Sequence, residues 1–205
     1  MTLLSFDTLL RPGSDDVVSV GTLGPTGTSS EVAAARFAHR VAVAGDPPAA
    51  VHLFDTYEEA ADALREEAVT HVVVANAYKA VHHFYMDPAL ELTNVFVMDT
   101  PLYGIAAREG AVPVTDSPTV ASHPSPEPII AQLMPARHTT YKVMYADSTS
   151  AAALAVQDGT ADLALTTVPA AERYGLTFIT GKRPIRMVWS VFTKAGPAGS
   201  TGPVV

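Results

Sequence analysis

Apolar and polar positions follow two kinds of pattern along this chain. Short apolar runs typical of buried strands alternate with stretches whose apolar residues recur at helical spacing. In the first half, the predicted elements are strand Val17–Leu23, helix Ser30–Val43, strand Val51–Phe54 and strand His71–Ala75. A further helix is expected after Asp55 or Thr56, because Thr56-x-x-Glu59 has the spacing of a capping box. In helix Ser30–Val43, the residues expected to face the core are Val32, Ala35, Phe37 and Ala38.

The second half of the chain repeats this pattern. Its predicted extended segments are Asn94–Met98, Leu102–Ala107, Thr119–Ser122, Tyr141–Tyr145, Asp162–Thr166 and Val188–Thr193. Helices are expected up to about Met134 and over Ala151–Val156. The β-α-β order predicts parallel sheets covered by helices.

Two such halves predict an α/β fold with two lobes and a cleft between them. Residues 1–98 and 167–194 are expected to form lobe one, and residues 99–166 lobe two. Residues 195–205 are rich in Gly, Pro and Ser and are expected to be a disordered tail.

Composition removes several classes of function. The net charge of −8 disfavours nucleic acid and anionic membrane surfaces as partners. Without cysteine, the chain has no disulfide, no thiolate nucleophile and no cysteine metal site. The start of the chain lacks the pattern of a signal peptide, and no apolar run approaches the roughly 18 residues of a membrane span. We therefore expect a cytoplasmic protein.

Two helix starts carry candidate binding chemistry. The glycine-rich stretch Gly24–Gly27 leads into Thr28, Ser29 and Ser30, and Ser148, Thr149 and Ser150 open a helix in the second half. Hydroxyls and N–H groups at helix starts suit a carboxylate or phosphate, but these residues are equally typical of ordinary N-caps. Two such starts would suit a dianionic small molecule held in the cleft between the lobes.

Four landmarks, in order, resemble the prephenate dehydratase family. They are the Gly24–Glu31 motif, Val74–Ala77 with Asn76, the sequence Ser122-His123-Pro124, and Ser148–Ser150 followed by Ala170–Leu176. The resemblance covers roughly Val18 to Phe192. It implies the two-lobed fold of the dehydratase catalytic domain, which is also like that of type II periplasmic binding proteins. It places the asparagine and the serine of the landmarks in the active site.

The departures from the dehydratase pattern are equally informative. Dehydratases carry Thr-Arg-Phe near the end of the catalytic domain, and its threonine is the proposed acid for the departing hydroxyl. Here the stretch Arg186–Phe192 lacks that motif, and a family glutamine falls on Ile129. We also expect no phenylalanine-sensing ACT domain. The stretches His82–Met86, Asp99–Gly104 and Trp189–Phe192 instead resemble the prephenate decarboxylases of bacilysin-type antibiotic pathways.

The resemblance therefore implies a lyase that removes CO2 from prephenate and leaves the ring non-aromatic. Without an acid near the ring hydroxyl, water loss slows and decarboxylation can compete. We expect catalytic roles for His83, Asn76 and Ser122. The expected substrate-binding residues are Thr28, Ser29, Ser30, Tyr78, Thr100, Tyr103, Ser148, Thr149, Ser150 and Trp189, with Trp189 and Ile129 offering an apolar wall.

No cofactor or metal is expected, because the electrons released with CO2 can enter the diene of the substrate. His82 and His83 are neighbours without a third ligand at metal spacing. Ser122 and His123 are adjacent, so they do not suit a hydrolase pair. Arg186 is a candidate anion clamp, with Arg108 and Lys79 as alternatives.

Three functions stay open on the sequence. The first is the decarboxylase, the second a monofunctional prephenate dehydratase with a relocated acid, and the third a small-acid binding protein without turnover. Prephenate is the expected partner in each case, and the chain could pair as a homodimer.

Overall fold

The computed structural model describes residues 18–41, 49–110, 115–136 and 140–196. The predicted tail lies largely outside these residues. The chain divides into two compact units. The first contains the described parts of Met1–Leu23, Ala34–Val97 and Val188–Val205, and the second contains Gly24–Ala33 and Met98–Met187. Residues 24–33 and 167–187 thus belong to the second unit, whereas the sequence analysis assigned both to lobe one.

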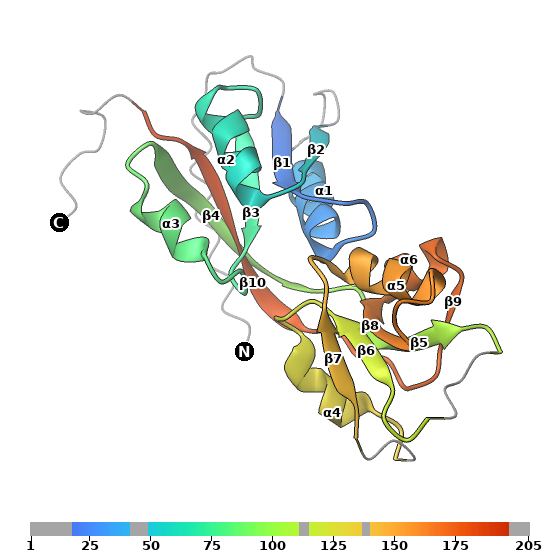
Figure 1. The fold of residues 1–205 in the computed structure, drawn as a ribbon. Helices are drawn as coiled ribbons and strands as arrows, with labels where there is room; N and C mark the ends of the chain where they lie inside the picture. The colour runs from blue at the N-terminus through green and yellow to red at the C-terminus, as the bar shows by residue number, and fades with distance from the viewer. Residues whose placement is uncertain (1–17, 42–48, 111–114, 137–139, 197–205) are drawn as a thin grey trace, which may run out of the picture. The chain divides into compact units, whose positions relative to one another are not determined.

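The first unit is built on a five-stranded sheet with the order β2-β1-β3-β10-β4. Strand β1 (Ser19–Leu23) runs parallel to β2 (Ala50–Phe54) and β3 (His71–Ala75). Strand β10 (Arg186–Lys194) returns antiparallel to β3, with Trp189 opposite Ala75 and Ser190 opposite Val74. Strand β4 (Leu90–Asp99) lies at the edge (Figure 1).

Helices cover both faces of this sheet. Helix α2 (Tyr57–Arg65) and the short helix α3 (Val81–Met86) pack with Val72, Val74 and Phe192 in one apolar core. On the other face, Phe37 of α1 (Ser29–Val41) contacts the rings of His71 and Phe96. Because successive strand residues point to opposite faces, Ser190 shares the α2–α3 face with Phe192, and Trp189 points to the other.

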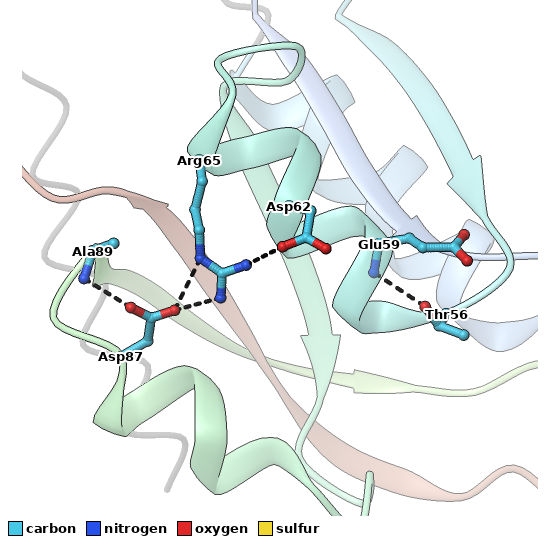
Figure 2. Close-up of polar contacts among 6 residues, drawn as sticks. All are labelled: Thr56, Glu59, Asp62, Arg65, Asp87 and Ala89. Carbon is cyan, nitrogen blue, oxygen red and sulfur yellow. Dashed lines mark hydrogen bonds and ion pairs between the residues drawn. The ribbon is translucent and has the colours of Figure 1, made fainter.

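A charged bridge ties α2 to the end of α3. The Arg65 guanidinium pairs with the carboxylates of both Asp62 and Asp87, and Asp87 also accepts the backbone N–H of Ala89 at 2.8 Å (Figure 2). These bonds lower the pKa of Asp87, the bond from Arg65 most of all. At the other end of α2, Thr56 accepts the N–H of Glu59 at 3.0 Å, as its capping-box spacing predicts. The bridge therefore fixes where α3 leaves the core.

The second unit has its own five-stranded sheet with the order β7-β6-β8-β5-β9. Strand β6 (Thr119–Ser122) runs parallel to β7 (Lys142–Tyr145) and β8 (Leu163–Thr167). Strand β5 (Tyr103–Arg108) pairs antiparallel with β8 and with β9 (Leu176–Phe178).

Small and large side chains separate the two faces of this second sheet. Helices α5 (Thr149–Gln157) and α6 (Val168–Arg173) pack on an alanine-rich core with Val156 and Leu176. Helix α4 (Ile130–Leu133), preceded by the 3-10 turn Glu127–Ile129, covers a core of larger residues on the other face. Small alanine side chains let a helix pack close to a sheet, and Figure 1 shows α5 and α6 beside this sheet.

The predicted strands are found with shifts of one or a few residues, but two details of the prediction are wrong. Val32 and Ala35 of α1 are exposed, and the inner face is formed by Ala33, Ala34, Phe37 and Ala38. The predictions also lacked α3, α6 and β9. Within the residues that the structure describes, no helix is long and apolar enough to span a membrane.

Candidate active site

The hydroxyls of both predicted helix starts cap their own helices. In α1, the Thr28 hydroxyl accepts the N–H of Glu31 at 3.3 Å, and the Glu31 carboxylate accepts the N–H of Gly27 at 2.7 Å. In α5, the Ser148 hydroxyl accepts the N–H of Ala151 at 3.0 Å. The Glu31 carboxylate thus lies at the start of α1, where the positive end of the helix dipole stabilises a negative charge. The start of α5 has no acidic residue in its first turn.

Further hydroxyls fasten the loop before α1 to the rest of the second unit. Ser150 donates to the carbonyl of Thr26 at 3.2 Å, and Thr167 donates to that of Gly27 at 3.4 Å. Gly27 has a φ of +93°, and a Cβ there would lie 3.3 Å from the Ser150 hydroxyl. Glycine is needed at this position for both conformation and space. The structure therefore brings the two predicted helix starts together within one unit.

The other predicted residues of the second unit are also tied to the fold. Ser122 is fully buried and donates to the carbonyl of His123 at 2.8 Å. Thr100 donates to the carbonyl of Pro101 at 2.9 Å and accepts the N–H of Ile185 at 3.0 Å. The Tyr103 hydroxyl lies 3.3 Å from that of Ser29, and burial raises the pKa of Tyr103, which keeps the phenol protonated. Among these, only the Ser29–Tyr103 contact joins two predicted site side chains.

Thr149 differs from its neighbours. It is buried, and its carbonyl accepts a bond from Thr166 at 2.7 Å. Its hydroxyl has no hydrogen-bond partner among the residues that the structure describes. A hydroxyl next to the first N–H groups of α5 is suited to an oxygen acceptor such as a carboxylate.

In the first unit, three side chains form a closed ring of hydrogen bonds. Ser190 donates to Asn76 Oδ1 at 2.7 Å, Asn76 Nδ2 donates to the Tyr85 hydroxyl at 3.1 Å, and the Tyr85 and Ser190 hydroxyls lie 2.6 Å apart. Since the Ser190 proton is used on Asn76, Tyr85 is the donor in the last bond. The backbone N–H of Asn76 also donates to the carbonyl of Val188 at 3.1 Å. Both backbone and side chain of Asn76 are thus held by β10.

Aromatic contacts hold Tyr85, one member of this hydrogen-bond ring. Tyr85 packs edge-on against Phe192, with ring centroids 5.3 Å apart, and Phe84 contacts the same phenylalanine. Ser190 is fully buried, whereas Asn76 and Tyr85 are exposed. The ring therefore runs from the core of the first unit to its surface.

Two more predicted residues lie on the same side of this unit. Tyr78 donates to Glu58 at 2.7 Å, and burial together with this carboxylate raises the pKa of Tyr78 to about 12. His83 is exposed on α3 and its ring contacts that of His82, with centroids 4.2 Å apart. No group of three or more His, Asp or Glu side chains that could hold a metal ion occurs in the described part of the chain.

Trp189 is buried with an unsatisfied polar atom. Its side chain is 1% exposed, and its Nε1–H is the buried side-chain donor that finds no partner within the described ranges. Leaving such a donor without a partner costs about 1–3 kcal/mol. Ile129, the other expected wall residue, instead packs on the apolar core beneath α4.

The three candidate cations are all exposed. Arg186 is exposed and forms a two-bond ion pair with Asp99, at 2.8 and 3.0 Å. Lys79 and Arg108 are both exposed. From the sequence, Tyr85 is expected beside His83 and Tyr78 as a cleft or supporting group. Sequence reasoning missed Ser190 as a site residue, because its signal is a contact between segments far apart in the chain.

Comparison with known protein families agrees with these landmarks. Residues 20–182 match the family model described as prephenate dehydratase. Among curated proteins, the chain is 40% identical over 184 residues to a prephenate decarboxylase of Planktothrix agardhii (strain NIVA-CYA 126/8), covering 86% of this chain and 88% of the relative. It is 37% identical over 181 residues to a prephenate decarboxylase of Bacillus subtilis, covering 87% of each chain.

Solved structures resemble the fold. A prephenate dehydratase from Arthrobacter aurescens in complex with L-Phe matches 90% of this chain with a TM-score of 0.66 at 16% identity. The match spans 63% of that longer protein. The periplasmic VFT2 domain of Bordetella pertussis BvgS matches 86% of this chain and 80% of that one, with a TM-score of 0.52 at 18% identity. At these identities the comparison concerns the fold alone.

Proposed function

Because the chain belongs to the prephenate dehydratase family, we propose that it removes CO2 from prephenate without making the ring aromatic. One observation carries the proposal. Relatives named prephenate decarboxylase are 37–40% identical to this chain over nearly the full length of both partners. The proposed enzyme is a carbon–carbon lyase of secondary metabolism, as the resemblance to bacilysin-type decarboxylases predicts.

The chemistry asks three things of the protein. The bond between the ring and its carboxyl carbon breaks, the electron pair moves through a ring double bond, and a proton is added to another ring carbon. The ring hydroxyl must stay in place, so no acid should protonate it. The protein must also bind the substrate anions and surround the departing carboxylate with less water.

The second unit supplies the anion-binding part of the proposal. We assign a substrate carboxylate to the N–H groups at the start of α5 and to the Thr149 hydroxyl. Thr28, Ser148 and Ser150 support this place by fixing the helix starts and the loop before α1. Ser30 is buried at the start of α1, and Ser29 and Tyr103 lie hydroxyl to hydroxyl.

Taken by itself, the first unit has three side chains whose protons bear on this chemistry. Trp189 is a buried side chain whose N–H donor lacks an acceptor. The Ser190 proton is committed to Asn76, which keeps this hydroxyl from acting as an acid. Tyr78, with its raised pKa, also stays protonated and bound to Glu58. His83 and Ser122 remain proposals for catalytic roles.

The alternative activity is dehydration, since the matching family model carries that name. Both reactions release CO2, so CO2 alone does not separate them. Incubation of the purified chain with prephenate, followed by product NMR and ultraviolet spectra, does. We expect a dihydro-4-hydroxyphenylpyruvate that retains the ring hydroxyl. Phenylpyruvate as the main product would establish the dehydratase, and tight binding without any product would establish a binding protein.

Location and assembly are further parts of the proposal. We propose a cytoplasmic enzyme without a nucleic-acid or membrane partner, on the basis of the acidic composition. A homodimer is tested by light scattering coupled to size exclusion, with a mass of either one or two chains of 21.5 kDa.

A further inference from the structure

We propose that Tyr85 and Ser190 are positioning residues for Asn76, and that their hydrogen-bond ring makes Asn76 a donor toward a carboxylate or keto oxygen of the substrate. The inference rests on the proposed function for the identity of that substrate. It rests on the geometry of the first unit for everything else.

The direction of the hydrogen bonds around the ring follows from the groups themselves. Asn76 Oδ1 can only accept, so the Ser190 hydroxyl donates to it, and Asn76 Nδ2 can only donate, so Tyr85 accepts there. Tyr85 then has its own proton for Ser190. All three bonds run the same way around the ring, and in such chains each bond strengthens the next by polarising it.

One side of the hydrogen-bond ring is buried and the other is exposed. Ser190 is fully buried in β10, and Tyr85 is 38% exposed on α3. The Asn76 amide therefore directs its oxygen toward the core and its nitrogen toward the surface. An amide nitrogen has two N–H groups, and Tyr85 takes one of them. The second N–H is what the exposed side of Asn76 can offer to an acceptor oxygen.

An asparagine without this ring would lack a fixed orientation. Rotation of its amide by half a turn would exchange donor and acceptor, and an exposed side chain loses entropy when a ligand selects one of the two. Three features remove that freedom before the substrate arrives: the ring, the bond from the backbone N–H of Asn76 to Val188, and the packing of Tyr85 against Phe192. The Arg65–Asp87 bridge, shown in Figure 2, holds the C-terminal end of α3. Tyr85 lies two residues before Asp87 and is supported by this bridge.

A set of variants separates positioning from mere structure. The test uses Tyr85→Phe, Ser190→Ala, Asn76→Ala and the double variant Tyr85→Phe/Asn76→Ala. Tyr145→Phe is the matched control, because Tyr145 is an exposed tyrosine whose phenol donates to Glu127 at 2.8 Å. Trp189 is the single tryptophan of the chain, so quenching of its fluorescence reports the Kd of prephenate without any need for turnover.

We expect Tyr85→Phe, Ser190→Ala and Asn76→Ala each to raise the Kd and KM for prephenate roughly tenfold, which is about 1.4 kcal/mol. Their kcat values should change less than about threefold, since the lost contact is made equally in the ground state and the transition state. The double variant should be no more than about twofold weaker than Asn76→Ala, because the two residues act as one unit. Tyr145→Phe should bind as the wild type does.

Three outcomes would overturn the inference. They are an unchanged Kd in Tyr85→Phe, additive losses in the double variant, and a lower melting temperature of Tyr85→Phe with normal binding. If the wild type binds prephenate with this variant pattern but forms no dihydro product, the positioning role stands and the proposed function fails. If the wild type forms the product while the Kd pattern is absent, the opposite holds. A wild type that does not bind prephenate removes both.

Discussion

The two units use polar side chains in different ways. In the second unit, four hydroxyls bond to backbone groups: Thr28 and Ser148 cap helices, and Ser150 and Thr167 hold the loop before α1, while Ser29 and Tyr103 bond to each other. In the first unit, Asn76, Tyr85 and Ser190 bond to one another. Where side chains hold the backbone, the N–H groups at helix starts are the atoms that we propose for ligand binding. Side chains that hold each other leave one of their own atoms for that purpose.

The comparison predicts which substitutions affect folding and which affect the reaction. Changes in the second unit should alter stability first and binding as a consequence. Changes at Trp189 or in the hydrogen-bond ring of the first unit should alter binding or product more than stability.

Gly27→Ala should have the largest effect on stability. The φ of +93° is unfavourable for alanine, and the new Cβ would crowd the Ser150 hydroxyl at 3.3 Å. We expect a loss of about 1–3 kcal/mol in the free energy of unfolding, measured by urea denaturation. Gly110→Ala is the control, because its φ of +69° is also positive but nothing lies within 4 Å of its Cβ. Equal losses in the two variants would show that crowding at Gly27 has no part in the effect.

Trp189→Phe tests the first unit through the product. The phenylalanine keeps an aromatic ring but removes the Nε1–H that lacks a partner. If this N–H serves the substrate, kcat/KM should fall about tenfold, the value of one hydrogen bond to a charged oxygen, and the share of phenylpyruvate should rise. Ile129→Val, in the core beneath α4, should lower stability by about 1 kcal/mol and leave the product ratio alone. A higher share of phenylpyruvate from the Ile129 variant alone would reverse these two roles.

Ser148→Ala should lower stability by about 1 kcal/mol, because the N–H of Ala151 loses its cap. Since the substrate carboxylate is assigned to the N–H groups of the same helix start, prephenate use should weaken while the identity of the product stays the same. Thermal unfolding and product NMR on one protein preparation measure both. A change of product with normal stability would place the Ser148 hydroxyl itself beside the reacting ring.

The Arg65–Asp87 ion pair should have the smallest effect on stability, and this effect depends on pH. Arg65 lowers its folded pKa, so the pair stabilises the protein above the unfolded pKa of about 4 and this stability is lost as the pH falls through the lower folded value. The pair is partly exposed, so we expect less than about 1 kcal/mol. Asp87→Asn should remove this part of the acid dependence of the unfolding midpoint. An unchanged acid profile in that variant would show that other carboxylates dominate.

Local signals in the sequence predicted the capped helices well. The caps at Thr56 and Ser148 were predicted correctly, because a helix cap involves residues only three positions apart. Helix α6 was missed although Pro169 stands near its start, a position that proline favours. Helix α3 is only six residues long, too short for a periodic pattern to appear.

The hydrogen-bond ring could not be predicted in this way. Ser190 lies 105 residues from Tyr85 and 114 from Asn76, and only the pairing of β10 with β3 brings them together. The two helix starts of the second unit meet for a similar reason, since the loop before α1 packs on α5 through the fully buried Ser150. The residue types were visible in the sequence, whereas their partners depend on strand order.

The most direct test of the proposed reaction is turnover of prephenate in D2O. Non-aromatising decarboxylation must add one solvent hydron to one ring carbon, because the electrons left by CO2 end there. We therefore predict a dihydro product that keeps its hydroxyl and carries one deuterium on a single sp3 ring carbon, as read by proton and carbon NMR. An aromatic phenylpyruvate without ring deuterium would contradict the account, since its electrons would have left with the hydroxyl group.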